Sequence, residues 1–199
     1  MAKLKNWFQT YSGKLVSITN PKPEDIDIID IAHALSMTCR FGGHCREFYS
    51  IAEHSIRVCE VGQFTCPINN DHPQAIAQAL AFLLHDAAEA YIGDLITPLK
   101  SNLGGAHELE TRWLRAIEQK YGLGTSLSEP SYDVKETDLR VLSFEVVKLF
   151  DCVDPTWWTK FKRPEQQDHF IINVQCWSPP RARREFLRLF NQLYGQLNH

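Results

Sequence analysis

The C-terminal part of the chain carries the most regular pattern of apolar and polar residues. An α-helix has about 3.6 residues per turn, so apolar residues spaced three and four positions apart lie on one side of it. Between residues 181 and 197, this spacing is followed by Phe186, Leu189, Phe190, Leu193 and Leu197. We therefore expect an amphipathic helix over residues 181–197.

The segment from Pro73 to Glu89 is instead apolar on nearly every face. A helix of this composition is buried at the centre of a domain. We expect one long helix over residues 73–89, with His85 and Asp86 near its C-terminal end. Packing on all sides would then hold these two polar side chains in place.

Helix-capping signals predict where another two helices begin. Ser50 and Glu53 have the spacing of a capping box, in which each side chain accepts a hydrogen bond from the other residue's backbone N–H. The helix that follows carries His54 and runs towards Val61. Upstream, Asp25 or Asp27 precedes a helix with the apolar face Ile28, Ile31, Ala32 and Leu35.

The remaining segments complete an all-α prediction with a minor hairpin. Residues 8–18 read as a β-hairpin that turns at Ser12 and Gly13. Further helices are expected at about 107–121 and 133–150, and irregular structure at 40–49 and 97–105. A chain of 199 residues suits one domain with a single core, and we expect a single domain over residues 1–199.

Composition narrows the class of protein. Hydrophobic residues make up 44% and charged residues 23%, as in a soluble globular protein, and the formal net charge is -3. The lack of a basic excess argues against a stable nucleic-acid partner. No stretch is apolar enough for a membrane, and no signal peptide is evident, so we expect a cytoplasmic protein, in the host cytoplasm if a phage encodes it. The six cysteines are expected to be reduced thiols.

Four residues have the chemistry of a divalent-metal site: His54, His85, Asp86 and Asp138. Two imidazoles and two carboxylates suit Zn, Co, Mn or Fe, whereas Mg alone rarely selects two histidines. The residues come from three separate predicted helices, so only a folded bundle brings them together. Two alternatives remain: a hydrogen-bonded pair of His85 with Asp86, and an ion pair of Asp138 with Arg140 or Lys135.

Two further acids lie close to the pair His85-Asp86 in the sequence. Glu89 is one helical turn beyond His85, where a carboxylate can orient or deprotonate an attacking water. Asp94 follows the flexible Gly93 and could protonate a departing alkoxide. A metal with two such acids is suited to phosphoester hydrolysis. The alternative for Glu89, a solvated acid at a helix end, is equally open.

These residues resemble the pattern of the HD-domain metal-dependent phosphohydrolases. The stretch Gly93-Asp94-Leu95-Ile96-Thr97-Pro98-Leu99-Lys100 is similar to a segment of the bacterial HD-type deoxyribonucleoside 5′-nucleotidases. Arg40-Phe41 stands ahead of Ala52-Glu53-His54, as an arginine and an aromatic residue do in that group. The resemblance covers about residues 26–142 and implies an HD-domain helical bundle with its core at about 26–150.

The resemblance also implies roles for individual residues. The metal ligands would be His54, His85, Asp86 and Asp138, with Glu89 and Asp94 as the catalytic acids. Substrate contacts would come from Arg40 and Lys100 to phosphate, from Phe41 and Pro98 to the sugar or base, and from His44. For His44, bracing the loop is an equal alternative. Phe41 departs from the pattern, because the nucleotidases usually have Trp there, which leaves base and phosphate specificity open.

The phage dATP triphosphohydrolases are compact relatives that this chain also resembles in its size and its Gly-Asp…Thr-Pro…Lys loop. This favours a dATP or dNTP triphosphohydrolase that releases a deoxynucleoside and triphosphate. The alternatives are a deoxyribonucleoside 5′-monophosphatase and a non-catalytic nucleotide-binding module. We expect one catalytic divalent metal, with Mg accompanying the phosphates, a small deoxynucleotide as substrate, no membrane partner, and a homo-oligomer such as a dimer or hexamer.

Overall fold

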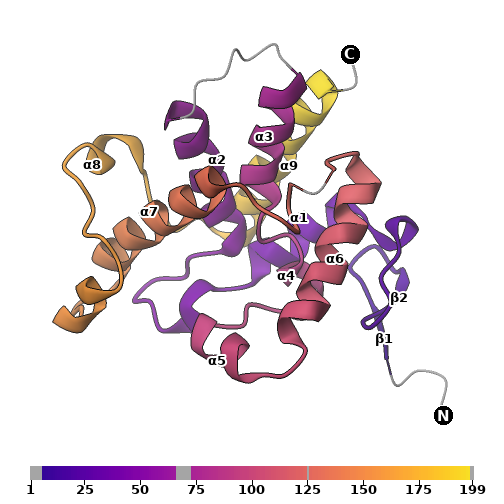
Figure 1. Cartoon of the computed structure of the whole chain (residues 1–199), viewed down its shortest axis with the longest axis horizontal. Helices are drawn as coiled ribbons and strands as arrows, with labels where there is room; N and C mark the ends of the chain where they lie inside the picture. Colours follow the sequence, from indigo (N-terminus) through magenta and orange to yellow (C-terminus); the bar gives the residue numbers. More distant parts are fainter. Residues whose placement is uncertain (1–5, 66–72, 125, 198–199) are drawn as a thin grey trace.

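The computed structural model describes residues 6–65, 73–124 and 126–197. In this part the chain is helical apart from one antiparallel hairpin, formed by β1 (Trp7–Gln9) and β2 (Leu15–Ser17) (Figure 1). This confirms the all-α class with a small N-terminal hairpin. The α-helices are α1 (Ile28–Met37), α2 (Ile51–Thr65), α3 (Pro73–Leu84), α4 (Glu89–Ile92), α5 (Thr97–Asn102), α6 (Ala106–Tyr121), α7 (Tyr132–Leu149), α8 (Asp168–Ile171) and α9 (Pro179–Leu197). Short 3-10 turns are η2 (Pro23–Asp25), η3 (Arg40–Gly43) and η4 (Pro155–Thr159).

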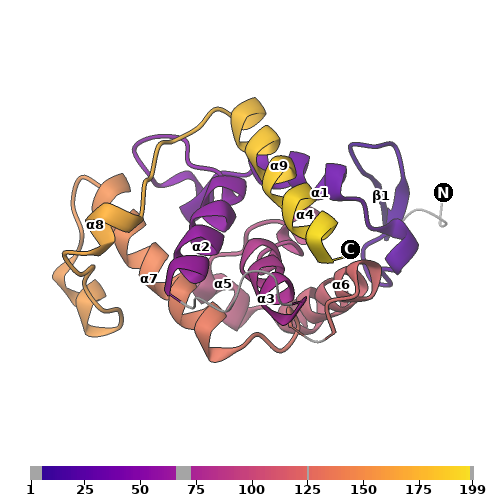
Figure 2. The same ribbon diagram turned by 90° about the horizontal axis from the view of Figure 1, so that it is seen from above.

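The core forms where α2 and α3 meet α9 and α7. Helix α9 lies against α1, α2 and α3, and α2 also packs against α7 (Figure 2). The predicted amphipathic helix is therefore present, and its apolar side faces this core through Phe186 and Phe190. None of the helices within the described ranges is long and apolar enough to cross a membrane.

The sequence left two candidates, Asp25 and Asp27, for the N-cap of helix α1. The Asp27 carboxylate accepts a hydrogen bond from the Ile29 N–H at 3.0 Å, so Asp27 is the N-cap. Asp25 instead accepts from the Lys22 N–H in the preceding turn η2. The predicted apolar face is correct, since Ile31 and its neighbours on that side are buried.

Helix α2 has half of the predicted capping box. The Ser50 hydroxyl accepts from the Glu53 N–H at 3.1 Å, as expected. The Glu53 carboxylate, however, does not return to Ser50. It is fully buried and accepts from the backbone N–H groups of Gln175 at 2.8 Å and Trp177 at 2.7 Å. Glu53 also forms a 3.3 Å ion pair with Arg57, four residues along the same helix. The two backbone partners lie more than a hundred residues away, so no local pattern could have identified them.

The predicted helix over residues 73–89 is wrong at its C-terminal end. Helix α3 ends at Leu84, residues 85–88 form turns, and the short helix α4 starts at Glu89. In these turns the N–H of Ala87 donates to Leu84 O at 2.9 Å, and that of Glu89 to Asp86 O at 3.0 Å. These three-residue hydrogen bonds are tighter than those of an α-helix and change the direction in which the side chains point.

The segment predicted as a loop at 97–105 contains a helix. Helix α5 has Pro98 in its first turn, where a proline loses no intrahelical hydrogen bond. The helices predicted at 107–121 and 133–150 are confirmed within one or two residues. Helix α7 starts after Ser131, whose hydroxyl accepts from the Val134 N–H.

Candidate metal centre

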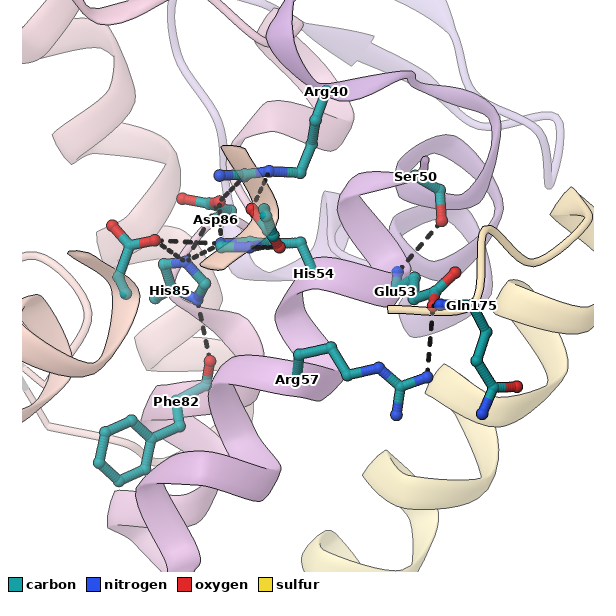
Figure 3. A network of polar contacts seen from close by, with 11 residues as sticks. Arg40, Ser50, Glu53, His54, Arg57, Phe82, His85, Asp86 and Gln175 are labelled. Atoms are coloured by element: carbon teal, nitrogen blue, oxygen red, sulfur yellow. Dashed lines mark hydrogen bonds and ion pairs between the residues drawn. The ribbon is translucent and has the colours of Figure 1, made fainter. Parts of the chain in front are cut away.

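Four predicted ligands converge from three parts of the chain. His54 lies on α2, and His85 and Asp86 lie in the turn after α3 (Figure 3). Asp138 lies on α7. The two Nε2 atoms of His54 and His85 are 3.3 Å apart. Asp138 Oδ1 is 3.1 Å from Nε2 of His54 and 3.8 Å from Nε2 of His85. Asp86 Oδ2 is 3.2 Å and 3.6 Å from the same atoms of His85 and His54.

This arrangement fits a bound cation. One donor atom from each of His54, His85 and Asp138 lies within 4.8 Å of the others. Ligands about 2.0–2.2 Å from a transition-metal ion lie roughly 3–4 Å from one another. Asp86 adds a carboxylate at the same spacing. The break after Leu84 is what lets adjacent residues 85 and 86 both face this point.

Hydrogen bonds at the opposite ring nitrogens orient both imidazoles. Nδ1 of His54 is 2.7 Å from Glu145 Oε1, and Nδ1 of His85 is 2.9 Å from the carbonyl oxygen of Phe82. Because these oxygens accept, each Nδ1 donates its proton to them and each Nε2 faces the centre. A metal-binding histidine requires this orientation, with the metal taking the place of a proton on Nε2.

Charges of opposite sign balance one another within the centre. Burial by itself raises the pKa of Asp86, but His85, His54 and Arg40 lower it well below its usual range. The pKa of Asp138 is likewise lowered by its neighbouring histidines, against the effect of burial. Burial lowers the pKa of His85, yet Asp86 and Asp138 raise it to about 9. Both aspartates are therefore carboxylates, ready to bind a cation.

The alternative of an ion pair between Asp138 and Arg140 is wrong. The Arg140 guanidinium instead contacts Asp168, with Nε 2.5 Å from Oδ1. Asp138 faces the two histidines, and Lys135 lines the same pocket as Asp138.

Glu89 and Asp94 lie beside the four ligands. Glu89 is 7% exposed, so it is not the solvated acid of the alternative interpretation. Burial raises its pKa well above the usual value, and the charges of Asp86 and Asp94 raise it further. Burial also raises the pKa of Asp94, with a contribution from Asp86. Gly93 turns the chain between them with a φ of +81°, which glycine adopts without strain. Both acids thus have the raised pKa values of acid-base groups.

Of the residues expected to contact substrate, Arg40 lies closest to the metal centre. Its Nη1 is 3.3 Å from Asp86 Oδ2, and its Nε is 3.3 Å from Glu145 Oε2. Phe41, in the left-handed region at a φ of 59°, packs edge-on against the ring of Phe150. This backbone conformation is uncommon for a bulky residue and fits a site that positions a side chain.

The other expected substrate contacts are less directly placed. Lys100 forms a 2.7 Å ion pair with Glu110, which lines the same pocket as His85 and Asp86. His44 and Pro98 have exposed side chains.

A pocket of about 190 Å³ opens beside the metal centre. His85, Asp86 and Asp138 form one of its walls, and α6, α7 and their connection form the others. The polar side chains that these elements contribute are His107, Glu110, Thr111, Ser128 and Lys135. A small ligand in this pocket would have direct access to the metal.

The sequence did not identify Glu145 as a residue of this site. It is fully buried on α7 and contacts both His54 and Arg40. One signal was available, since Glu145 follows Asp138 by seven residues, which is two helical turns and hence the same face of α7. Its partners on α2 and η3 could not be read from that spacing.

Comparison with known proteins agrees with this geometry. Residues 30–120 match the family described as 5′-deoxynucleotidase YfbR-like. The uncharacterized protein YfdR of Escherichia coli is 34% identical over 190 residues, which cover 94% of this chain and 96% of that protein. The uncharacterized protein RCAP_rcc00048 of Rhodobacter capsulatus is 38% identical over 196 residues, covering 96% of this chain and 97% of that protein. The chain therefore belongs to the YfbR-like group of HD-domain phosphohydrolases.

Proposed function

We propose that this protein hydrolyses deoxyribonucleoside 5′-monophosphates to a deoxynucleoside and orthophosphate, with one divalent metal. The observation that carries the proposal is the set of two facing imidazoles and two carboxylates, with the buried Glu89 beside them. The description of the matched family, 5′-deoxynucleotidase, supports the substrate class.

The residues present can perform each step of phosphate-ester hydrolysis. His54, His85, Asp86 and Asp138 would hold a divalent metal, which would supply a Lewis acid for a phosphoryl oxygen and lower the pKa of a water. Glu89 takes the proton from the attacking water as the new bond from oxygen to phosphorus forms. As the bond from phosphorus to the 5′-oxygen breaks, Asp94 gives its proton to that oxygen. Arg40 neutralises charge on the phosphoryl group.

Charge at the site supports a monophosphate. A triphosphate carries more negative charge and needs more cationic donors. The two basic residues expected at the phosphate are already paired with carboxylates: Arg40 with Asp86 and Glu145, and Lys100 with Glu110. Hydrolysis of dATP or another dNTP to triphosphate, which the sequence favoured, becomes the alternative proposal, because it would use the same metal and water.

A substrate screen tests the proposal and separates the alternatives. Purified protein is stripped of metal, reloaded with Mn, Co, Zn or Mg, and given dNMPs, NMPs and dNTPs. We expect orthophosphate from dNMPs, less from NMPs, and none after chelation. Chromatography that finds triphosphate from dNTPs, without hydrolysis of dNMPs, would establish the triphosphohydrolase instead. Nucleotide binding without any hydrolysis would indicate a non-catalytic module.

Assembly of the chain is a separate prediction. We expect a homo-oligomer, either a dimer or a hexamer, and light scattering coupled to size-exclusion chromatography measures its mass directly. A monomer at assay concentration would contradict the prediction without affecting the proposed reaction.

A further inference from the structure

Glu145 is a buried acid that the proposed reaction does not use. Its side chain is fully buried on α7, and its two oxygens contact different groups. Oε1 is 2.7 Å from Nδ1 of His54, and Oε2 is 3.3 Å from Nε of Arg40. One carboxylate thus bridges an expected metal ligand and an expected phosphate-binding residue.

Each oxygen of Glu145 faces a nitrogen atom of a different residue, His54 or Arg40. A buried carboxylate is costly unless its oxygens are satisfied by donors. Here Oε1 accepts a hydrogen bond from the imidazole N–H of His54, and Oε2 forms an ion pair with the Arg40 guanidinium at 3.3 Å.

The contact with Arg40 is an ion pair that places the guanidinium. Nε of Arg40 lies 3.3 Å from Oε2 of Glu145, and Nη1 donates a hydrogen bond to Asp86 at 3.3 Å. A guanidinium is planar, with its five donors in a rigid fork. Two carboxylates beside Nε and Nη1 therefore restrict where this fork lies, and its position decides which N–H groups reach a phosphate.

We propose that Glu145 is a positioning residue that couples metal binding to phosphate binding, because one of its oxygens orients the ligand His54 while the other holds Arg40 in place through an ion pair. The effect of Glu145 on phosphate binding rests on the proposed function, since it requires Arg40 to contact a phosphate group. Its effect on metal binding requires only that His54 binds the ion.

Glu145→Gln tests this double role. The amide keeps the size of the side chain but removes its charge and replaces one oxygen with an NH₂ donor. Its single oxygen can face His54 or Arg40, but not both, and it offers Arg40 no negative charge. We expect a loss of about 10–100-fold in metal affinity when His54 loses its acceptor, or a loss of about tenfold in phosphate affinity when Arg40 loses its ion-pair partner. Glu145→Ala removes both contacts and should show both losses.

The readouts need no turnover. Metal affinity is measured by titrating Mn or Zn into metal-free protein, and phosphate affinity by titrating inorganic phosphate into protein saturated with metal. If Glu145→Gln keeps both affinities within twofold of the wild-type protein, the proposal is overturned. If no nucleotide is hydrolysed by the wild-type protein, the proposed function fails, while the metal titration still tests Glu145.

A double variant and a matched control distinguish positioning from a general loss of structure. In an Arg40→Ala background, Glu145→Gln should no longer affect phosphate affinity, because the group that it positions is gone. A further loss of phosphate affinity there would contradict the proposal. Glu118→Gln is the control: Glu118 is also buried, and it accepts from the N–H groups of Leu127 and Ser128, away from His54 and Arg40. The metal affinity of the Glu118→Gln variant should equal that of the wild-type protein, even if the variant has a lower thermal stability.

Discussion

The metal centre is half-buried and the apolar face of α9 is buried, and different physical terms hold them together. At the metal centre, charged groups from separate parts of the chain satisfy one another, as His54 does with Glu145 at 2.7 Å. On α9, which packs against α1 and α3, Phe186 and Phe190 are buried in the hydrophobic core with no polar partner required. Apolar packing tolerates exchange of similar volumes, whereas a polar cluster fails when one partner is removed. Variants in the two regions should therefore fail in different ways.

The largest expected effect is at Asp86. Asp86→Ala removes a carboxylate that lies 3.2 Å from His85 Nε2 and 3.3 Å from Arg40 Nη1. We expect metal binding and turnover to be lost together, with the helical circular dichroism spectrum retained. Elemental analysis of the purified variant measures its metal content. Normal metal content with normal turnover would remove Asp86 from the ligand set.

Phe186→Ala should have the opposite effect: it should lower the stability of the fold and leave the reaction unchanged. The Phe186 side chain is fully buried, and truncating it leaves a cavity. The free energy of unfolding should fall by about 3–5 kcal/mol in urea titrations. Metal affinity of the folded protein should not change. Phe186→Leu, a smaller change in volume, serves as the control and should cost less.

Glu89→Gln should reduce kcat by about 100-fold or more, as expected when a general base is lost. The metal should stay bound, since Glu89 is not one of the four ligands. Steady-state kinetics at saturating metal measure the effect. A variant with full activity would exclude Glu89 from the mechanism.

The pH dependence of the rate follows from the raised pKa of Glu89. A general base must be deprotonated, so kcat should fall as the pH falls through this pKa. Because burial, the largest cause, raises it above 4.5, the acid limb should lie above pH 4.5. The limb should be absent from the residual activity of Glu89→Gln. An unchanged limb in that variant would assign it to another group.

The smallest effect is expected on the solvated side of α9. Arg188 forms a 2.9 Å ion pair with Glu185 near the helix surface. Exposed pairs of this kind contribute about 0–1 kcal/mol. Arg188→Ala should therefore change the unfolding free energy by no more than that in the same urea titration. A loss comparable to that of Phe186→Ala would show that this side of α9 is buried in an oligomer.

The sequence by itself determined most of the helical framework and the set of candidate ligands. Helix periodicity and capping depend on residues a few positions apart, so α1, α6, α7 and α9 could be predicted to within about two residues. The ligand set could be named because two histidines and two aspartates are chemically distinctive, and because their spacing resembles a known family.

Tertiary structure alone decided how those residues are held. The end of α3 at Leu84, the contact of Glu145 with His54, and the acceptance of the Gln175 and Trp177 N–H groups by Glu53 all involve contacts outside the reach of local patterns. A buried charge takes its partner from whichever segment packs against it, and that segment can be any distance away along the chain. Patterns among residues close together in the sequence therefore locate the helices and the reactive groups. The partners that orient those groups are fixed only when the helices pack.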